Sequence, residues 1–394
     1  MKAPVLRIAI VVPGRFHAFD LAKGLIRRGH DVVVLTNYPK WAAQRFGLPR
    51  DRVWSFWLHG LLSRMADGMQ NQWGYQGLEP FLHRLFGEWS WRCLRKKEWD
   101  VVHPWSGIGE EVSIRAQKTL RLLMRGSAHI RTQSRLLREE QARVGRRIDQ
   151  PSPWMIEREE REYLLADKII VLSTFARDTF LREGVPADKL WVLPLGADVR
   201  MFRPPPEALE ERIRRITAGE PLRILYVGAL SFRKGLWDLG SLARSLSPEE
   251  FRIRAVGPAS AETRGFLRGF KDRMKIEPKV PQRHLAAVYR WADLFVFPTI
   301  EDGFAVVLAQ AQAAGLPILT TVHCSGPDLV EEGRTGWIFP IRDPAGMAER
   351  LRWCQSHRNE MVEMVRRIYY VHKTRDWDDV SKNFESMICA ALKP

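Results

Sequence analysis

The sequence predicts an α/β protein in which two doubly wound domains face a central cleft. Short apolar segments alternate with amphipathic, helix-like segments along most of the chain, which is the pattern of parallel sheets covered by helices. This alternation stops at the prolines of residues 204–206 and then starts again. A chain of 394 residues, 45% hydrophobic and 27% charged, has the size and composition of two globular domains with full cores.

The first half opens with a strand–helix–strand unit. Residues 6–12 and 31–36 are apolar runs that predict strands, and residues 18–28 predict the helix between them, with Gly29 at its end. The loop before this helix contains Gly14 but lacks the GxGxxG pattern of dinucleotide-binding proteins. On its own, this loop is equally well explained as a plain strand–helix turn.

Residues 51–99 depart from this alternation because they are rich in Trp and other large apolar residues. The apolar positions are three and four apart, which predicts amphipathic helices. One interpretation is a helix pair that faces the core. The other is a surface that docks on a membrane or binds an acceptor.

Positive charge is concentrated in the same half of the chain. Residues 1–200 contain 33 Lys and Arg against 22 Asp and Glu, a net charge of +11, and eight of the 15 Trp lie within the first 105 positions. Basic charge with aromatic residues suits an anionic membrane surface. It would also suit nucleic acid, but the sequence has no zinc-finger, RNA-recognition or homeodomain pattern, so we do not expect a nucleic-acid partner.

Two histidines lie at predicted strand ends or turns in the first half, where side chains can face the cleft. His103 lies in the predicted strand of residues 100–105. His129 lies in a turn at residues 125–130, before a charged helix expected from Arg135. We expect both imidazoles to face the cleft, although a lone His is more often a structural residue.

Residues 292–317 are the most informative segment of the chain. The apolar run 294–297 predicts a buried strand, and Gly303 marks a polar turn after it. An Ala-rich helix is expected from about Phe304 to the Gly315 stop. The segment is therefore a strand–turn–helix unit with the helix start at the sheet edge.

Polar groups gather at the start of this helix. Asp302 comes just before it, and free N–H groups are expected at Phe304, Ala305 and Val306, which together make a site for an anion such as a diphosphate. Gln310 lies two turns on, on the same face, where its amide could reach a second polar group of the same ligand.

This segment resembles the acidic signature of the retaining glycosyltransferases of family 4, which have the GT-B fold. Their pattern has a carboxylate, Gly-Phe-Gly and a second carboxylate eight positions after the first. Asp302 stands for the first acid, Ala305 for the last glycine and Gln310 for the second acid, which holds the donor ribose in the family. A Gln can hydrogen-bond a ribose diol, but without the charge-assisted strength of a carboxylate.

Residues 228–235 are similar to the phosphate loop of the same family. Lys234 matches its Lys, whereas Ala229 occupies the position of its Arg, and Arg233 is the candidate to replace that cation. Cations at a helix start are unfavourable without an anion nearby, which favours a phosphate ligand over a solvated surface. The resemblance also implies that Gly14 faces the donor diphosphate.

The resemblance implies a set of site residues. The catalytic candidates are His103, His129 and Asp302. The donor-binding candidates are Gly14, Arg233, Lys234, Gly303, Phe304, Ala305, Val306 and Gln310. Trp105 stands where many relatives have a second His. No metal ligand and no cofactor are expected, because the nucleotide sugar is itself the substrate.

The resemblance covers about residues 5–385 and implies a separate role for each of three segments. Residues 1–203 would bind the acceptor, residues 204–375 the nucleotide sugar, and residues 376–394 would form a helix that crosses back to the first domain. The implied function is a metal-independent, retaining glycosyltransferase. It would move a sugar from a nucleotide-diphosphate sugar to a lipid-linked or polysaccharide acceptor in cell-envelope glycan synthesis.

Two other functions remain open at this point. One is a sugar-nucleotide epimerase or hydrolase on the same fold, and the other is a non-catalytic nucleotide-sugar-binding protein, suggested by Ala229, Ala305 and Gln310. The sequence shows no signal-peptide pattern and no apolar run long enough to span a bilayer. We expect a cytoplasmic protein, with peripheral attachment to the inner membrane leaflet as an option.

Overall fold

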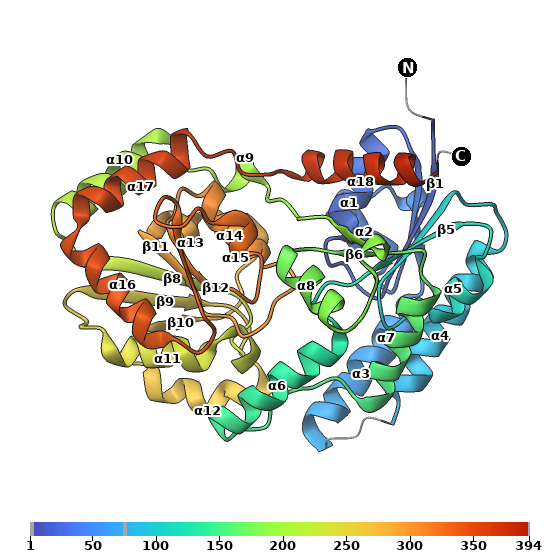
Figure 1. Ribbon diagram of the computed structural model, residues 1–394, viewed down its shortest axis with the longest axis horizontal. Coiled ribbons are helices and arrows are strands. Elements are labelled where there is room, and N and C mark those ends of the chain that lie inside the picture. Colours follow the sequence, from blue (N-terminus) through green and yellow to red (C-terminus); the bar gives the residue numbers. More distant parts are fainter. Residues whose placement is uncertain (1–3, 74–76, 393–394) are drawn as a thin grey trace.

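Two parallel sheets, each covered by helices on both faces, make up the computed structural model, which describes residues 4–73 and 77–392 (Figure 1). The first sheet has seven strands in the order β3-β2-β1-β4-β5-β6-β7, and the second has six in the order β10-β9-β8-β11-β12-β13. The predicted fold class is confirmed, because both sheets are parallel and doubly wound.

The first domain contains residues up to the Pro-rich segment. Its strands are β1 (Arg7–Val12), β2 (Asp31–Thr36), β3 (Val53–Ser55), β4 (Val101–Pro104), β5 (Leu120–Met124), β6 (Lys168–Val171) and β7 (Leu190–Val192). Its helices are α1 (Ala18–Arg27), α2 (Lys40–Arg45), α3 (Trp57–Trp73), α4 (Glu79–Leu94), α5 (Glu110–Arg115), α6 (Ile130–Val144), α7 (Pro153–Leu165) and α8 (Thr174–Arg182). The short helix α9 (Val199–Phe202) leads to the second domain.

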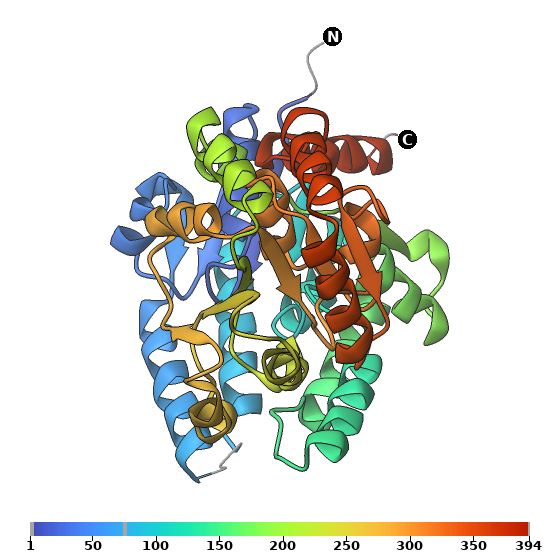
Figure 2. The same ribbon diagram turned by 90° about the vertical axis from the view of Figure 1, so that its left-hand side faces the viewer.

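The second domain repeats the same architecture. Its strands are β8 (Leu222–Val227), β9 (Phe251–Val256), β10 (Lys275–Glu277), β11 (Leu294–Phe297), β12 (Ile318–Thr321) and β13 (Gly336–Phe339). Its helices are α10 (Pro206–Thr217), α11 (Leu236–Ser245), α12 (Arg264–Leu267), α13 (Gln282–Trp291), α14 (Val306–Ala313), α15 (Gly326–Leu329), α16 (Pro344–Ser356) and α17 (Arg358–Tyr370). Seen from its own side, this domain lies in front of the first one (Figure 2).

The last helix, α18 (Trp377–Ala391), returns to the first domain and packs on α1 (Figure 1). Gly24 of α1 makes this possible, because a Cβ there would lie 1.7 Å from the hydroxyl oxygen of Ser381. Glu385 of α18 accepts a hydrogen bond from Arg28 Nε at 2.6 Å and lies 3.1 Å from His30 Nε2. The two domains are therefore linked both by the α9 segment and by α18.

The helix pair of residues 51–99 is buried on one side and exposes apolar side chains on another. Phe86 and Leu94 of α4 are buried, so this helix covers the sheet. The first half of α3 and the start of α4 instead expose an apolar patch, which we call the α3 patch: Trp57, Leu58, Leu61, Leu62, Met65 and Phe81. Trp73 and Tyr75 fall outside the residues whose side chains are described. No helix in the described ranges is both long and apolar enough to cross a bilayer.

Two helix starts differ from the expectation. Helix α6 begins at Ile130 and not near Arg135, because the side chain of His129 caps it by accepting the N–H of Arg131 at 3.3 Å. Helix α14 begins at Val306, two residues later than expected, because the turn continues through Ala305.

Gly24→Ala tests the packing of α18 on α1. We expect a loss of roughly 1–3 kcal/mol in the free energy of unfolding, because the added methyl group overlaps Ser381. Urea unfolding measures it, and Gly269→Ala is the control, since nothing lies within 4 Å of a Cβ at that position. Ser381→Gly in the Gly24→Ala background should restore stability. Equal stability of the two single variants would contradict the packing of α18 on α1.

Candidate active site

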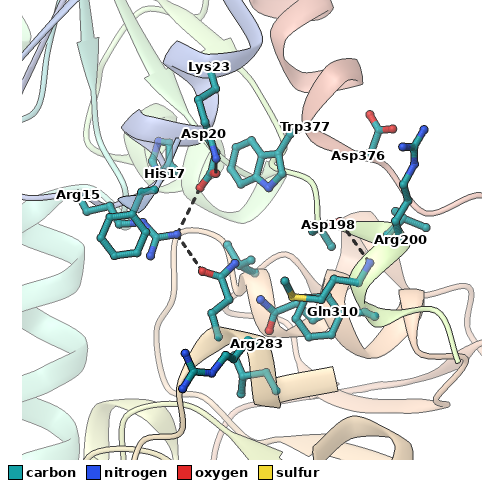
Figure 3. Close-up of a pocket in the computed structure, with 18 of the residues that line it drawn as sticks. Arg15, His17, Asp20, Lys23, Asp198, Arg200, Arg283, Gln310, Asp376 and Trp377 are labelled. Carbon is teal, nitrogen blue, oxygen red and sulfur yellow. Dashed lines mark hydrogen bonds and ion pairs between the residues drawn. The ribbon is translucent and has the colours of Figure 1, made fainter. Parts of the chain in front are cut away.

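Two cavities lie between the domains and meet at Phe16, His17 and Val306. The larger, the α13 cavity, has a volume of about 1180 Å³ and runs from α1 to the start of α13 (Figure 3). The smaller, the α6 cavity, has a volume of about 900 Å³ and is lined by residues of the first domain together with Arg233 and Phe304. Val306 at the start of α14 therefore faces both cavities.

Lys234 and Asp302 form an ion pair at the start of α14. Lys234 Nζ lies 2.7 Å from Asp302 Oδ2 and donates a hydrogen bond to the backbone carbonyl of Glu301 at 3.1 Å. Burial lowers the pKa of Lys234, and the charge of Asp302 opposes that shift. Asp302 also accepts the N–H of Phe304 at 3.2 Å, so one of the expected anion-binding donors is used within the chain.

Glu301 is a functional candidate that the sequence reasoning missed. Its side chain is fully buried and accepts hydrogen bonds from Arg233 Nε at 2.8 Å, the N–H of Ala128 at 2.9 Å and Gln133 Nε2 at 3.1 Å. Burial alone would raise the pKa of Glu301, but the positive charges of Arg233 and Lys234 lower it to about 2. The only signal in the sequence was its position immediately before Asp302.

Arg233 lies at the α6 cavity, as expected for a site residue, but it is not a free cation. Besides Glu301, it donates a hydrogen bond to Ser127 Oγ at 2.8 Å. The two cations of the loop are thus paired with two carboxylates, Arg233 with Glu301 and Lys234 with Asp302. A phosphate here would have to compete with these partners or join them.

His103 does not face the cleft, which corrects the expectation from its position at a strand end. Its ring is fully buried, 5.0 Å from the rings of Trp105 and Phe384, and Nδ1 lies 2.7 Å from the carbonyl of Leu122. Burial lowers the pKa of His103 to about 4, so it is neutral at pH 7. It packs behind Trp105 because Phe384 of α18 covers that side of the sheet.

His129 is also a structural residue. Besides capping α6, it packs between the rings of Tyr163 and Phe180 at 5.0 and 4.9 Å, and burial lowers its pKa to about 4. Neither His103 nor His129 is among the residues that line the α13 and α6 cavities.

His17 is an imidazole at the cleft that was not among the predicted site residues. It lines both cavities, and its ring lies 5.0 Å from that of Trp105. Burial, with a smaller effect of His103, lowers the pKa of His17 to about 3, and its Nε2 has no hydrogen-bond partner among the described residues. No periodic pattern points to His17, because it lies in the loop between β1 and α1.

Of the remaining predicted donor residues, Gln310 lines one of the two cavities, whereas Gly14, which was expected to face the donor diphosphate, lines neither. Gln310 lines the α13 cavity and accepts a hydrogen bond from Tyr289 Oη at 2.9 Å. Gly303 lies against the first domain, where a Cβ would be 2.3 Å from the carbonyl oxygen of Gly126. Ala305 caps α14, and Gly14 has a φ of +153° and lines a third cavity of about 370 Å³.

The sequence matches two models of protein families. The model "Glycosyltransferase Family 4" matches residues 15–200, and the model "Glycosyl transferases group 1" matches residues 221–357. The first covers most of the first domain and the second most of the sheet of the second domain.

Curated relatives match over parts of the chain. The chain is 27% identical to the WcaL protein of Escherichia coli over 51% of each sequence. It is 31% identical to the D-inositol 3-phosphate glycosyltransferase of Xylanimonas cellulosilytica over 49% of each. It is 26% identical to the amylovoran biosynthesis glycosyltransferase AmsK of Erwinia amylovora over 59% of each. The matched part thus spans about half the length of these relatives.

Solved structures match the whole fold. The complex of Anabaena HepE with UDP and glucose has a TM-score of 0.70 at 14% identity and covers 97% of this chain and 99% of that one. WaaG, a glycosyltransferase involved in lipopolysaccharide biosynthesis, has a TM-score of 0.65 at 16% identity, with the same coverage of 97% and 99%. At these identities the likeness shows the fold alone.

Glu301→Gln tests the buried carboxylate. The folded pKa of about 2 lies below the ordinary 4.5, so this group stabilises the protein above pH 4.5, and the effect is lost as the pH falls towards 2. We expect the free energy of unfolding of the variant to be about 3 kcal/mol lower at pH 7. The variant should also lack the loss of stability that Glu301 causes in the parent as the pH falls from 4.5 towards 2. Urea unfolding across pH measures both, with Glu349→Gln on α16 as control. A variant with the parent's pH profile would contradict this role.

Proposed function

Because the chain belongs to glycosyltransferase family 4 and has the GT-B fold, we propose that it transfers a sugar from a nucleotide-diphosphate sugar to an acceptor hydroxyl. The observation that carries this proposal is the position of the start of α14, where Val306 lines both interdomain cavities. Asp302, which forms an ion pair with Lys234, lies in the segment just before this helix. One cavity can take the nucleotide and the other the acceptor.

The donor diphosphate would bind at the start of α14. The N–H groups of Val306 and Val307 belong to the first turn, where a helix has donors without intrahelical acceptors and a partial positive charge. Lys234 would add a full charge, worth roughly 4 kcal/mol for a pair at 4 Å in a partly hydrated site. These groups would stabilise the charge that develops on the leaving diphosphate.

The nucleoside would occupy the α13 cavity. Gln310 faces this cavity from α14, and its amide N–H₂ remains for a ribose hydroxyl while its oxygen accepts from Tyr289. Val280 and Pro281 also line the cavity, next to the start of α13, and would contact the base.

The acceptor would occupy the α6 cavity. Trp105 lines it and offers an aromatic face to a sugar ring, and Gln133 and Ser127 add polar groups. We propose transfer with retention of configuration and without a metal ion, in which the leaving phosphate takes the proton of the acceptor hydroxyl. Asp302 would orient Lys234, and His17 would contact the sugar as a neutral imidazole.

The acceptor class is proposed from the relatives and from the surface. AmsK is named for amylovoran biosynthesis and WaaG for lipopolysaccharide biosynthesis, and both point to cell-envelope or extracellular glycans. The exposed α3 patch and the exposed basic residues 95–97 suit an anionic bilayer that presents a lipid-linked acceptor. We therefore propose a cytoplasmic enzyme attached peripherally to the inner leaflet.

A non-catalytic nucleotide-sugar-binding protein is the second candidate. It is favoured by Ala229, Ala305 and Gln310, which replace a cation, a glycine and a carboxylate of the family pattern. Such a protein would bind the donor but would form no glycoside product with any acceptor.

Lys234→Ala should lower the rate of sugar transfer about a hundredfold or more, because the leaving diphosphate loses a buried cation. The measurement is product formation with a matching donor and acceptor, together with thermal unfolding to confirm that the variant folds. Lys275→Ala on β10, whose exposed Lys pairs with Glu277, is the control. Activity within threefold of the parent would contradict the assignment, and a parent that binds donor without transfer would favour the second candidate.

Replacing Arg95, Lys96 and Lys97 with Gln should weaken binding to anionic vesicles and leave donor affinity unchanged. Each basic side chain near such a surface contributes about 1 kcal/mol, and salt should release the parent protein. Vesicle flotation at low and high salt measures this. The control replaces three exposed basic residues of the second domain, Arg264, Arg268 and Lys271, with Gln. A parent protein that does not float with anionic vesicles at low salt would contradict the attachment.

A further inference from the structure

The second domain has fewer free cations for a diphosphate than its phosphate loop suggests. Ala229 provides no charge, and Arg233 and Lys234 are paired with Glu301 and Asp302. A nucleoside diphosphate carries at least two negative charges. Charge therefore has to come from elsewhere in the cleft if the site binds this group well.

Arg15 of the first domain reaches across the cleft. It lies in the loop between β1 and α1, and its Nη2 donates a hydrogen bond to Gln282 Oε1 at the start of α13, at 3.1 Å (Figure 3). Its guanidinium lines the α13 cavity, which Val306 and Gln310 line from the opposite domain. Arg15 is thus placed over the same cavity as the start of α14.

The side chain of Arg15 is held in place before any ligand arrives. Its guanidinium carbon lies 4.0 Å from the centre of the Phe46 ring, and the nearest carboxylate, Asp20, is 3.8 Å away and pairs more closely with Lys23 at 2.7 Å. The buried Nε of Arg15 has no acceptor among the described residues. A guanidinium that is oriented but only partly hydrogen-bonded is suited to a phosphate, which it can bind with two donors at once.

Two of the other basic residues that line this cavity are already engaged within the first domain. Lys23 is neutralised by Asp20, and the guanidinium of Arg45 packs on Trp41 with its carbon 4.8 Å from the ring centre. Arg15, Lys23 and Asp20 together carry one net positive charge, and the hydrogen bond of Arg15 is the one that already crosses to the second domain.

We propose that Arg15 binds the diphosphate of the donor from the first domain and replaces the cation that is missing at Ala229. This inference rests on the proposed function and adds the residue that couples donor binding to both domains. Because Arg15 and α14 belong to different domains, a diphosphate between them would hold the cleft closed, and a nucleoside alone would not.

The test compares nucleoside diphosphates with nucleosides. UDP, GDP, dTDP and ADP, and the four corresponding nucleosides, are titrated calorimetrically into the parent and into Arg15→Gln. We expect Arg15→Gln to weaken binding of the diphosphate that the parent binds by at least tenfold and to leave the affinity for its nucleoside within about twofold. Arg15→Lys, which keeps the charge but loses the planar fork, should fall between the two.

Two further variants separate a phosphate contact from a structural effect. Arg244→Gln removes another arginine that packs on a Phe ring, Phe270, outside the α13 cavity, and should bind the diphosphate as the parent does. Ala229→Arg in the Arg15→Gln background should recover at least threefold of the lost affinity, because it restores a cation at the same ligand.

The possible results distinguish the role of Arg15 from the proposed function. If the parent binds a diphosphate and Arg15→Gln binds it equally well, the role of Arg15 is wrong and the proposed function stands. If Arg15→Gln weakens the diphosphate and its nucleoside by the same factor, Arg15 shapes the cavity and is not a phosphate ligand. If the parent binds none of the four diphosphates, the proposed function fails, and the role of Arg15 fails with it.

Discussion

The buried carboxylate of Glu301 is the group on which the arrangement of the cleft depends. An ionised carboxylate without partners costs several kcal/mol in a protein interior, so its hydrogen bonds to Arg233, Ala128 and Gln133 are required for the observed packing. Two of these partners belong to the first domain and one to the phosphate loop of the second. Glu301 therefore sets the distance between the domains and fixes Arg233 at the same time.

The charges of the cleft follow from this arrangement. In the second domain, the two cations of the phosphate loop form ion pairs with carboxylates of the same domain. The α13 cavity, by contrast, is lined by seven Lys and Arg residues and four Asp residues. The lining of this cavity therefore carries a net positive charge, which favours an anionic ligand. The relative position of the two domains also depends on α18, which packs against Gly24 and contacts Arg28 and His30 through Glu385.

The sequence was sufficient for several of the strands and for part of the site, but not for the short strand β3, which lies in a segment predicted to be helical, or for contacts between distant loops. Strands β2 and β11 have the predicted bounds, because buried parallel strands are short apolar runs with clear ends. Lys234 and Asp302, which were predicted as site residues from two separate motifs, form an ion pair. His103 and His129 were misplaced because position at a strand end does not determine which way a side chain turns. Glu301 and Arg15 were missed as partners because their contacts join separate domains.

The central claim is that the cleft binds a nucleotide-diphosphate sugar. A thermal-shift screen of the parent protein with UDP-, GDP-, dTDP- and ADP-sugars tests it most directly, because any ligand that binds only the folded state raises the unfolding temperature. We expect the nucleotide sugars of one base to raise the unfolding temperature by several degrees and the corresponding free sugar to leave it unchanged. An unchanged unfolding temperature with millimolar concentrations of all four classes would contradict it.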